Sequence, residues 1–356
     1  MNPILVSGIQ PTGKLHIGNY LGALKNFVEL QDSGKYECFF FVADLHSLTE
    51  NFDPKEKRTQ INDVLLSFLA AGLDIKKSTI FVQSEISEHS ELAWILNTIT
   101  PMGELRRMTQ FKGKAFKGLL DRGVEIKSFG NELEIGGKKM NSLDDAYSEF
   151  SNFGLIDYPV LMAADVLIYN AKFVPVGNDQ DQHLELARTL ARKFNAKFGK
   201  TFIEPQALHA EVPRLMSLDD PEKKMSKSRP EGCLFLDDEP EVIRKKIKRA
   251  VTDSGSEVKF DEKEKPAISN LLLIYSAFSG KTIKQVEKMY AGKGYGQFKS
   301  DLAEVVIEGL APFQKKKNEL KKKLPQILKE IEKGNKKTKT VASKKMLEIK
   351  KKVGLI

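Results

Sequence analysis

Two short segments, more than two hundred residues apart, constrain the fold of this chain. The first, residues 11–19, reads Pro-Thr-Gly-Lys-Leu-His-Ile-Gly-Asn and follows the apolar run Ile4–Ser7. A strand, a turn of small residues and a helix start, in this order, predict a nucleotide-binding unit, because the turn lets a phosphate approach the backbone. We expect His16 and Asn19 to face those phosphates.

The second segment, residues 223–228, reads Lys-Lys-Met-Ser-Lys-Ser and places basic and hydroxyl side chains on one loop. Each segment alone has a plain alternative: His16 as an ordinary surface or packed histidine, and the lysine segment as a solvated turn or a localisation-like basic patch. In this order and at this separation, the pair resembles the two signatures of class I aminoacyl-tRNA synthetases. Asn19 stands where the first signature has its second histidine.

Length and composition favour two domains and a reducing compartment. The 356 residues exceed the usual size of one domain. Cys38 and Cys233 have no paired spacing, so the sequence supports neither a disulfide framework nor a zinc site. It contains no apolar run long enough to span a bilayer, and residues 1–3 lead directly into a strand. We therefore expect a cytoplasmic protein without a membrane partner.

The net charge of +9 is concentrated near the C-terminus. Residues 315–352 contain sixteen lysines and four glutamates, so this segment carries +12 and the rest of the chain carries −3. Two interpretations stay open. The lysines bind a polyanion such as RNA and release its counterions, or they form a solvated helix surface.

The first half of the chain alternates short apolar runs with helical patterns, which predicts an α/β fold with a Rossmann-like, doubly wound parallel sheet. The expected strands are Ile4–Ser7, Phe39–Ala43, Ile80–Gln83 and Phe173–Val176. Ligands of such a sheet bind at the carboxyl ends of its strands.

Two helices are expected between these strands. Asp53 and Pro54 are typical of an N-cap and a first helical residue, and Ser87 is expected to cap the next helix. Trp94, the single tryptophan, lies on that second helix, and we expect it in the core rather than against a ligand.

From about residue 230 the apolar residues repeat at helical spacing, with separate helices expected over 320–331 and 342–353. Residues 113–150 form an insertion, in which Gly136-Gly137 predicts a hairpin between Glu132–Ile135 and a strand from Lys138. The expected organisation is a Rossmann-like catalytic domain over 1–218, a lysine loop over 219–230, a C-terminal helical domain over 231–336, and a last helix over 340–356 that packs back on the first domain.

Four further segments narrow the resemblance. They are residues 158–165 (Tyr-Pro-Val-Leu-Met-Ala-Ala-Asp), 174–183 (Val-Pro-Val-Gly-Asn-Asp-Gln-Asp-Gln-His), 250–254 (Ala-Val-Thr-Asp-Ser) and 292–299 (Gly-Lys-Gly-Tyr-Gly-Gln-Phe-Lys). With the two signatures they closely resemble bacterial tryptophanyl-tRNA synthetases over nearly the whole chain, except residues 113–150. The resemblance implies a homodimer with L-tryptophan, ATP and tRNA(Trp) as partners, and an anticodon-binding role for residues 231–336. The insertion is expected near the subunit interface or the active-site rim.

The reaction that this resemblance implies has two steps: the tryptophan carboxylate attacks the α-phosphate of ATP, and the adenylate is then transferred to the 3′ end of tRNA. No covalent enzyme intermediate is needed, so the protein orients the reactants and stabilises charge on the phosphates. By resemblance, the residues that do so are Lys224 and Lys227 on the closing loop and His16 and Asn19 in the first segment. Mg²⁺ is expected on the ATP phosphates, without protein ligands, because the sequence offers no carboxylate cage.

The resemblance also assigns an ATP site, in which Leu215 is expected against the adenine and the serines of the lysine loop donate hydrogen bonds. The residues of this site are Gln10, Pro11, Thr12, Gly18, Asn19, Gly177, Asn178, Asp179, Leu215, Lys224, Met225, Ser226, Lys227 and Ser228.

A pocket for indole must be mostly apolar and offer one acceptor to the ring N–H. By resemblance that acceptor is Asp165, although Ala-Ala-Asp by itself would indicate a surface carboxylate. Tyr158 and Met162 precede it by seven and three residues and share its helix face. The other expected pocket residues are Val174 and Val176 on a strand, Gln180 and Gln10 at the ammonium or carboxylate, and His46, for which a structural role stays open.

Three alternatives remain. The related tyrosine enzyme would need groups that bind a phenol and a large C-terminal RNA-binding appendage. A small-molecule nucleotidyltransferase sharing the His-x-Gly turn would not need the basic helical half. A non-catalytic RNA-binding paralogue should have lost a signature, and both are intact here.

Overall fold

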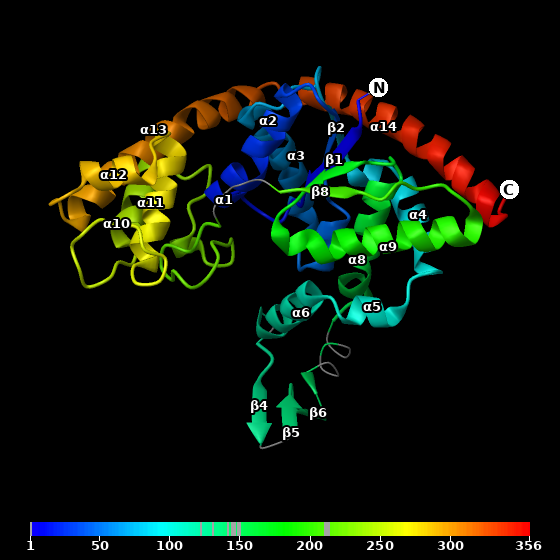
Figure 1. Cartoon of the computed structure of the whole chain (residues 1–356), viewed down its shortest axis with the longest axis horizontal. Coiled ribbons are helices and arrows are strands. Elements are labelled where there is room, and N and C mark those ends of the chain that lie inside the picture. The colour runs from blue at the N-terminus through cyan, green and yellow to red at the C-terminus, as the bar shows by residue number, and fades with distance from the viewer. Residues whose placement is uncertain are drawn as a thin grey trace.

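Five parallel strands form the central sheet, in the order β3-β2-β1-β7-β8 (Figure 1). The structure is a computed structural model and describes residues 2–121, 123–129, 132–140, 142–143, 147, 151–209 and 214–356. The strands are β1 (Ile4–Ile9), β2 (Glu37–Val42), β3 (Thr79–Val82), β7 (Phe173–Pro175) and β8 (Gln206–Leu208). The predicted α/β fold with a doubly wound parallel sheet is confirmed.

Four of these strands match the predicted ones, with ends that differ by at most two residues. The edge strand β8 was not predicted, because its three residues Gln-Ala-Leu are only partly buried and form no apolar run.

Strand residues alternate between two apolar clusters, one on each face of the sheet. Leu5 and Phe40 belong to the cluster that includes residues of α2 and α3, while Val6, Phe39 and Phe81 belong to the one that includes residues of α4, α8 and α9. Both faces are therefore buried, as a parallel sheet requires. The helices of this part are α1 (Ile17–Asn19), continued by a π-helical turn (Tyr20–Leu24) and α2 (Lys25–Asp32), then α3 (Pro54–Ala71), α4 (Glu88–Asn97), α5 (Met102–Arg106), α6 (Thr109–Asp121), α8 (Phe153–Leu167) and α9 (Asp181–Phe198).

The chain from residue 240 onward is helical and forms the part on the left of Figure 1 together with the long arc above the sheet. Its helices are α10 (Pro240–Arg249), α11 (Pro266–Ser279), α12 (Ile283–Met289), α13 (Tyr295–Lys321) and α14 (Leu324–Val353). The prediction of two separate helices over 320–331 and 342–353 is wrong, since α14 is one helix of 30 residues. Only a narrow stripe of α14 is buried, so the polar residues between its apolar positions hid its continuity in the sequence.

Helix α14 covers the edge of the sheet. It packs along β3 and α4, and Asn335 Oδ1 accepts a hydrogen bond from the backbone N of Val82, 3.0 Å away. At Gly334 a Cβ atom would lie 2.1 Å from the carbonyl oxygen of Ile80, so a larger residue would push the helix away. The edge strand is therefore closed by a helix.

A small antiparallel sheet, β4 (Ile126–Phe129), β5 (Glu132–Ile135) and β6 (Lys138–Met140), projects from the body beyond α6 (Figure 1). The predicted hairpin is confirmed: Gly136 and Gly137 join β5 to β6 with positive φ angles of 59° and 77°, which a two-residue hairpin turn requires. Helix α6 also runs into residues 113–150, where the sequence showed no sustained helical period.

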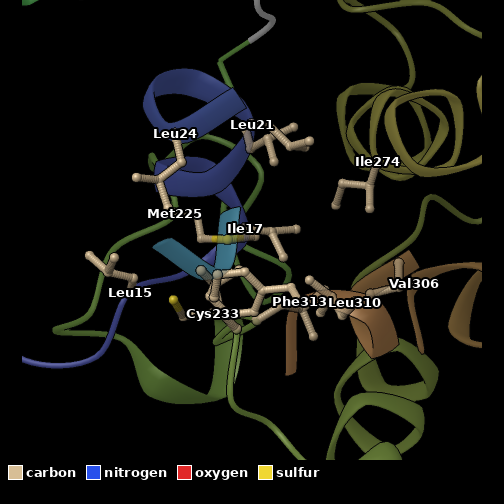
Figure 2. Close-up of a cluster of buried hydrophobic side chains, with 14 of the residues drawn as sticks. Leu15, Ile17, Leu21, Leu24, Met225, Cys233, Ile274, Val306, Leu310 and Phe313 are labelled. Atoms are coloured by element: carbon tan, nitrogen blue, oxygen red, sulfur yellow. The ribbon is translucent and has the colours of Figure 1, made fainter. Parts of the chain in front are cut away.

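The helical part and the sheet-containing part share one apolar core (Figure 2). Leu15 and Ile17, from the segment after β1, lie with Met225 and Cys233, while Leu310 and Phe313 approach from α13. The first segment, the lysine loop and α13 are thus packed against one another.

A buried lysine reinforces this junction. Lys317 of α13 is 1% exposed, and its Nζ lies 2.8 Å from Asp63 of α3 and 2.7 Å from Asp237. Two carboxylates compensate one buried ammonium group, which would otherwise be costly.

The structure tests the predicted caps of α3 and α4 and the predicted burial of Trp94. Asp53 caps α3 as predicted, but Ser87 makes no capping hydrogen bond at α4. The placement of Trp94 in the core is wrong: its side chain is 72% exposed. The buried face of α4 is formed by Leu92, Ala93, Ile95 and Leu96, which leaves Trp94 on the outer side.

Candidate active site

A cavity of about 510 Å³ opens where the strand order reverses, at the carboxyl ends of β1 and β7. Ser7 Oγ of β1 donates to the carbonyl oxygen of Pro175 of β7, 2.9 Å away, which ties the two strands together beside the opening. Gly8 lies at this point, and a Cβ there would meet the ring of Phe41 at 2.7 Å. Phe41 belongs to β2, which pairs with β1 on its other side, so the packing of this ring against β1 requires glycine.

Asp165 of α8 is 2% exposed, and its side chain reaches the cavity. Its Oδ2 lies 2.8 Å from Nε2 of His46, and its Oδ1 accepts from Nε2 of Gln83, also at 2.8 Å, and contacts Nδ1 of His89. Burial alone would raise the pKa of Asp165, but His46 and His89 hold this pKa below its usual range. The site therefore presents an ionised carboxylate at the end of an apolar space.

A second histidine-centred group lines another wall. Nε2 of His183 lies 2.9 Å from the hydroxyl of Tyr158, and its Nδ1 lies 3.0 Å from Oε1 of Gln180. Burial, followed by the charge of Lys114, lowers the pKa of His183 to about 4, so the ring is neutral at pH 7. A neutral imidazole can donate from Nδ1 to Oε1 of Gln180 and accept at Nε2 from the hydroxyl of Tyr158. The NH₂ group of Gln180 then remains a donor, and the ring of Tyr158 is held in place.

Near the rim, Nζ of Lys114 lies 5.0 Å from the centre of the Tyr158 ring and 3.2 Å from Oε1 of Glu50. Met162, Val174 and Val176 add apolar surface to the same cavity. The cavity therefore combines an apolar chamber, a buried carboxylate, and amide and charged groups near the rim. Such a cavity can bind a zwitterionic amino acid whose flat, apolar side chain carries one hydrogen-bond donor.

His16 of the first segment serves as the cap of α1. Its Nδ1 accepts from the backbone N of Gly18 at 3.1 Å, and its own backbone N donates to Oδ1 of Asn19 at 3.1 Å. Burial, together with the charges of Lys227 and Lys224, lowers the pKa of His16 to about 4. The histidine is therefore neutral at pH 7 and stabilises the helix start that a phosphate would approach.

The lysine loop is held directly beside this turn. Nζ of Lys227 lies 3.3 Å from both Thr12 Oγ1 and the carbonyl oxygen of Gly13, and burial lowers its pKa. Met225 is 2% exposed and anchors the loop in the core (Figure 2), while Lys224 is exposed. The hydroxyls of Ser226 and Ser228 bond to each other at 2.8 Å.

The structure brings together all the residues predicted for the amino-acid pocket, along with several predicted for the ATP site. The predicted residues that line the cavity are Gln10, Asn19, His46, Tyr158, Met162, Asp165, Val174, Val176, Gly177, Asp179 and Gln180.

Other residues predicted for the ATP site lie outside this lining. Pro11, Thr12 and Gly18 belong to the adjacent turn, Asn178 lies in the short helix Asn178–Gln180, and Lys224, Ser226, Lys227 and Ser228 lie on the lysine loop. Leu215 is 4% exposed and is packed in the core, where its carbonyl oxygen accepts from the backbone N of Met225 at 3.1 Å. The placement of Leu215 against an adenine stays a prediction.

Sequence reasoning missed several residues of the site. Gln83 and His89 contact Asp165, and Glu50 and Gln110 line the cavity. Gln83 follows β3, and the carboxyl end of a strand could have identified it. Nothing comparable marks His89, which lies on a helix among apolar residues.

Within the described ranges, no group of three histidine, cysteine, aspartate or glutamate side chains is arranged to hold a metal ion. None of the helices in the described part of the chain is long and apolar enough to cross a bilayer.

The family model described as "tRNA synthetases class I (W and Y)" matches residues 1–311. The tryptophan--tRNA ligase of Bacillus anthracis is 44% identical over 355 residues, which are 99% of this chain and 98% of the relative. The tryptophan--tRNA ligase of Rickettsia conorii is 44% identical over 360 residues, with all of both chains covered.

Solved structures give the same result. The tryptophanyl-tRNA synthetase of Mycoplasma pneumoniae superposes with a TM-score of 0.83 at 34% identity, covering 99% of this chain and 98% of its own. That of Campylobacter jejuni, complexed with ADP and tryptophan, superposes with a TM-score of 0.77 at 34% identity, covering 98% and 99%. A tyrosyl-tRNA synthetase from Aeropyrum pernix, 18% identical with a TM-score of 0.64, covers 93% of this chain and 89% of its own, and shares the fold.

Proposed function

The chain belongs to the class I tRNA synthetases of the tryptophan and tyrosine group, and we propose on this basis that its cavity binds L-tryptophan beside an ATP site at the first segment and the lysine loop. Its activity is that of an aminoacyl-tRNA synthetase: it activates tryptophan with ATP and transfers it to tRNA(Trp). The observation that carries the substrate assignment is the buried, ionised Asp165 in an otherwise apolar chamber.

Recognition of tryptophan follows from the two histidine-centred groups. The indole ring occupies the apolar space beside Met162 and Val174, and its N–H donates to the Asp165 carboxylate. Tyr158 and Gln180, both held by His183, bind the amino-acid backbone of the substrate together with Gln10. A phenol would present its hydroxyl farther from the Cβ atom and along the ring axis, whereas the indole N–H lies closer and points sideways, so this arrangement favours indole.

Asp165→Ala tests the substrate assignment. The indole N–H would lose its acceptor, at a cost of about 1 to 3 kcal/mol, so kcat/KM for tryptophan in ATP–pyrophosphate exchange should fall about 5- to 150-fold. The KM for ATP should change little. Discrimination against 3-benzothienylalanine, whose ring sulfur replaces the N–H, should weaken as well.

The exposed Asp32 provides a matched control, because Asp32→Ala removes a carboxylate far from the cavity. Wild-type tryptophan activation by Asp165→Ala, or better activation of tyrosine than of tryptophan by the wild-type enzyme, would refute the substrate assignment.

The ATP phosphates are proposed to lie between the first segment and the lysine loop. The neutral His16 and the amide-rich start of α1 favour an anion there, and Lys227 already lies against Thr12 and Gly13. When the tryptophan carboxylate attacks the α-phosphate, negative charge grows on the departing pyrophosphate, and Lys227 and Lys224 stabilise it as point charges.

Mg²⁺ is proposed as a companion of the ATP phosphates, where it neutralises their charge. No group of carboxylates in the described part of the chain fits a dedicated magnesium site, so we assign it no protein ligand.

Lys227→Ala should slow adenylate formation about 100-fold while changing the KM for tryptophan little, because the charge contributes most when pyrophosphate departs. Single-turnover adenylate formation measures the step directly. Lys223→Ala is the control, since Lys223 is on the same loop, is exposed and pairs with Asp220. An effect of Lys227→Ala confined to the KM for tryptophan, with kcat intact, would contradict this role.

The domain division is also a proposal: residues 1–218 as the catalytic domain, 219–230 as the closing loop, and 231–336 as the domain that binds the tRNA anticodon. Its support is that the five-stranded sheet ends at Leu208, whereas regular structure from residue 240 onward is helical. Four exposed lysines, Lys281, Lys284, Lys288 and Lys293, lie on or beside α12, at the end of the helical part farthest from the sheet (Figure 1). Such a basic surface suits an RNA backbone.

The double variant Lys284→Ala/Lys288→Ala should raise the KM for tRNA(Trp) in aminoacylation several-fold, because two phosphate contacts are lost. ATP–pyrophosphate exchange, which needs no tRNA, should be unchanged. The exposed pair Lys35→Ala/Lys55→Ala in the catalytic domain is the charge-matched control. Equal effects of the two pairs on the KM for tRNA would argue against the assigned surface.

We further propose a cytoplasmic homodimer. Trp94, Met102 and Phe153 are 72%, 70% and 69% exposed, and Asn97 of α4 bonds to Asp157 of α8 within one turn of Trp94 and Phe153. Large exposed apolar side chains are typical of a subunit interface. Cys38 and Cys233, buried as free thiols, suit a reducing compartment.

Sedimentation velocity should give a dimer at micromolar concentration, and Trp94→Lys should shift the distribution towards monomer by placing a charge in the interface. Lys35→Ala, away from this surface, should leave the dimer intact. A monomeric wild-type protein would rule out the homodimer.

A further inference from the structure

His89 lies behind Asp165 and does not reach the cavity. It is 0% exposed and sits in the first turn of α4, with Nδ1 against Oδ1 of Asp165 and Nε2 against the hydroxyl of Tyr169. The rings of Phe41, Phe81 and Tyr169 pack edge-on around it, with ring centres 5.4 to 6.2 Å away. His89 therefore lies out of reach of a substrate in the cavity, and among the described residues its two ring nitrogens contact Asp165 and Tyr169.

The hydrogen positions follow from the partners. An ionised carboxylate only accepts, so Nδ1 of His89 carries a proton and donates to Asp165. With this proton on Nδ1, Nε2 can accept from the hydroxyl of Tyr169, which lies against it. Burial, together with the charges of Asp165 and Glu88, raises the pKa of Tyr169, so the hydroxyl keeps its proton.

The two oxygens of Asp165 are used unequally. Oδ1 accepts from both His89 and Gln83, while Oδ2 accepts from one donor within the described ranges, His46. A carboxylate has about four acceptor positions. The one that remains is on Oδ2, and Asp165 lines the cavity, so a donor on the ligand would be received there.

We propose that His89, held by Tyr169, is a positioning residue for recognition of the ring N–H: it occupies Oδ1 and so keeps the free acceptor of Oδ2 directed into the cavity. The inference rests on the proposed function, in which Asp165 accepts from the indole. It assigns selectivity for an N–H donor to a histidine and a tyrosine that never contact the substrate.

The test compares tryptophan with 3-benzothienylalanine, which lacks the ring N–H, in ATP–pyrophosphate exchange. In His89→Leu, kcat/KM for tryptophan should fall about tenfold or more, as for loss of a hydrogen bond to a charged group. The analogue, which donates nothing to Asp165, should lose much less. A merely structural role would lower both values equally.

Two milder variants keep the test decisive if His89→Leu does not fold. In His89→Asn the amide nitrogen takes the place of Nδ1, so selectivity should be largely restored relative to His89→Leu. Tyr169→Phe removes only the hydroxyl that fixes the imidazole, and selectivity should fall several-fold with an unchanged melting temperature. The proposal would be overturned if His89→Leu and Tyr169→Phe both folded and kept the wild-type ratio of kcat/KM for tryptophan to kcat/KM for the analogue. If His89→Leu does not fold, the ratio measured for Tyr169→Phe decides.

A pH profile adds a second readout. The titratable groups that face this pair are His46, Tyr169 and Glu88. Removing the His89 donor takes away one of the interactions that lower the pKa of Asp165, so the carboxylate protonates at higher pH. The acid limb of kcat/KM for tryptophan should therefore shift to higher pH in His89→Leu, whereas that for the analogue should not.

Asp165→Ala separates the two ways in which this inference can fail. If Asp165→Ala keeps the wild-type ratio between tryptophan and the analogue, the proposed role of Asp165 is wrong. If Asp165→Ala abolishes the preference but the His89 and Tyr169 variants keep it, only the positioning role of His89 is wrong.

Discussion

A short backbone pairing connects the two signature segments. Ile17 donates its backbone N–H to the carbonyl oxygen of Leu234 at 3.0 Å, Leu236 donates to that of Leu15 at 2.9 Å, and His16 pairs with Phe235 between them. The segment after β1 is thereby joined to the chain that follows the lysine loop. Because Met225 and Cys233 are buried beside Leu15 and Ile17, the pairing lies within a shared core (Figure 2). The pairing and this core hold the lysine loop beside the turn, where Lys227 contacts Thr12.

The amino-acid pocket depends on a different constraint, the burial of one negative charge. A carboxylate that is 2% exposed is tolerated only with several donors, and Asp165 receives them from three parts of the chain. His46 comes from the turn after β2, Gln83 from the end of β3, and His89 from α4. Since these donors fix the charge before any ligand arrives, the pocket is preorganised for a ligand that brings a single N–H.

Two further sets of contacts hold the helical part against the sheet-containing part. Lys317 bonds to Asp63 and Asp237, so α13 is linked both to α3 and to the chain just beyond the paired segment. Helix α14 then follows the edge strand β3, close enough that Gly334 faces the backbone of Ile80. These contacts fix the position of the helical part relative to the sheet.

Local patterns in the sequence predicted four of the five strands and many of the residues that line the cavity, while the positions of the ligands stay a prediction. Apolar runs fix strands, and helical spacing places Tyr158, Met162 and Asp165 on one face, because both are local periodicities. It could not determine the exposure of Trp94, the continuity of α14 or the role of His89. A lone histidine among apolar residues has the same local pattern whether it packs or bonds, and only the meeting of α4, α8 and the ends of β2 and β3 decided its partners. Packing between distant segments likewise decided that Met225 and Leu215 are buried, since burial depends on neighbours that the local sequence does not specify.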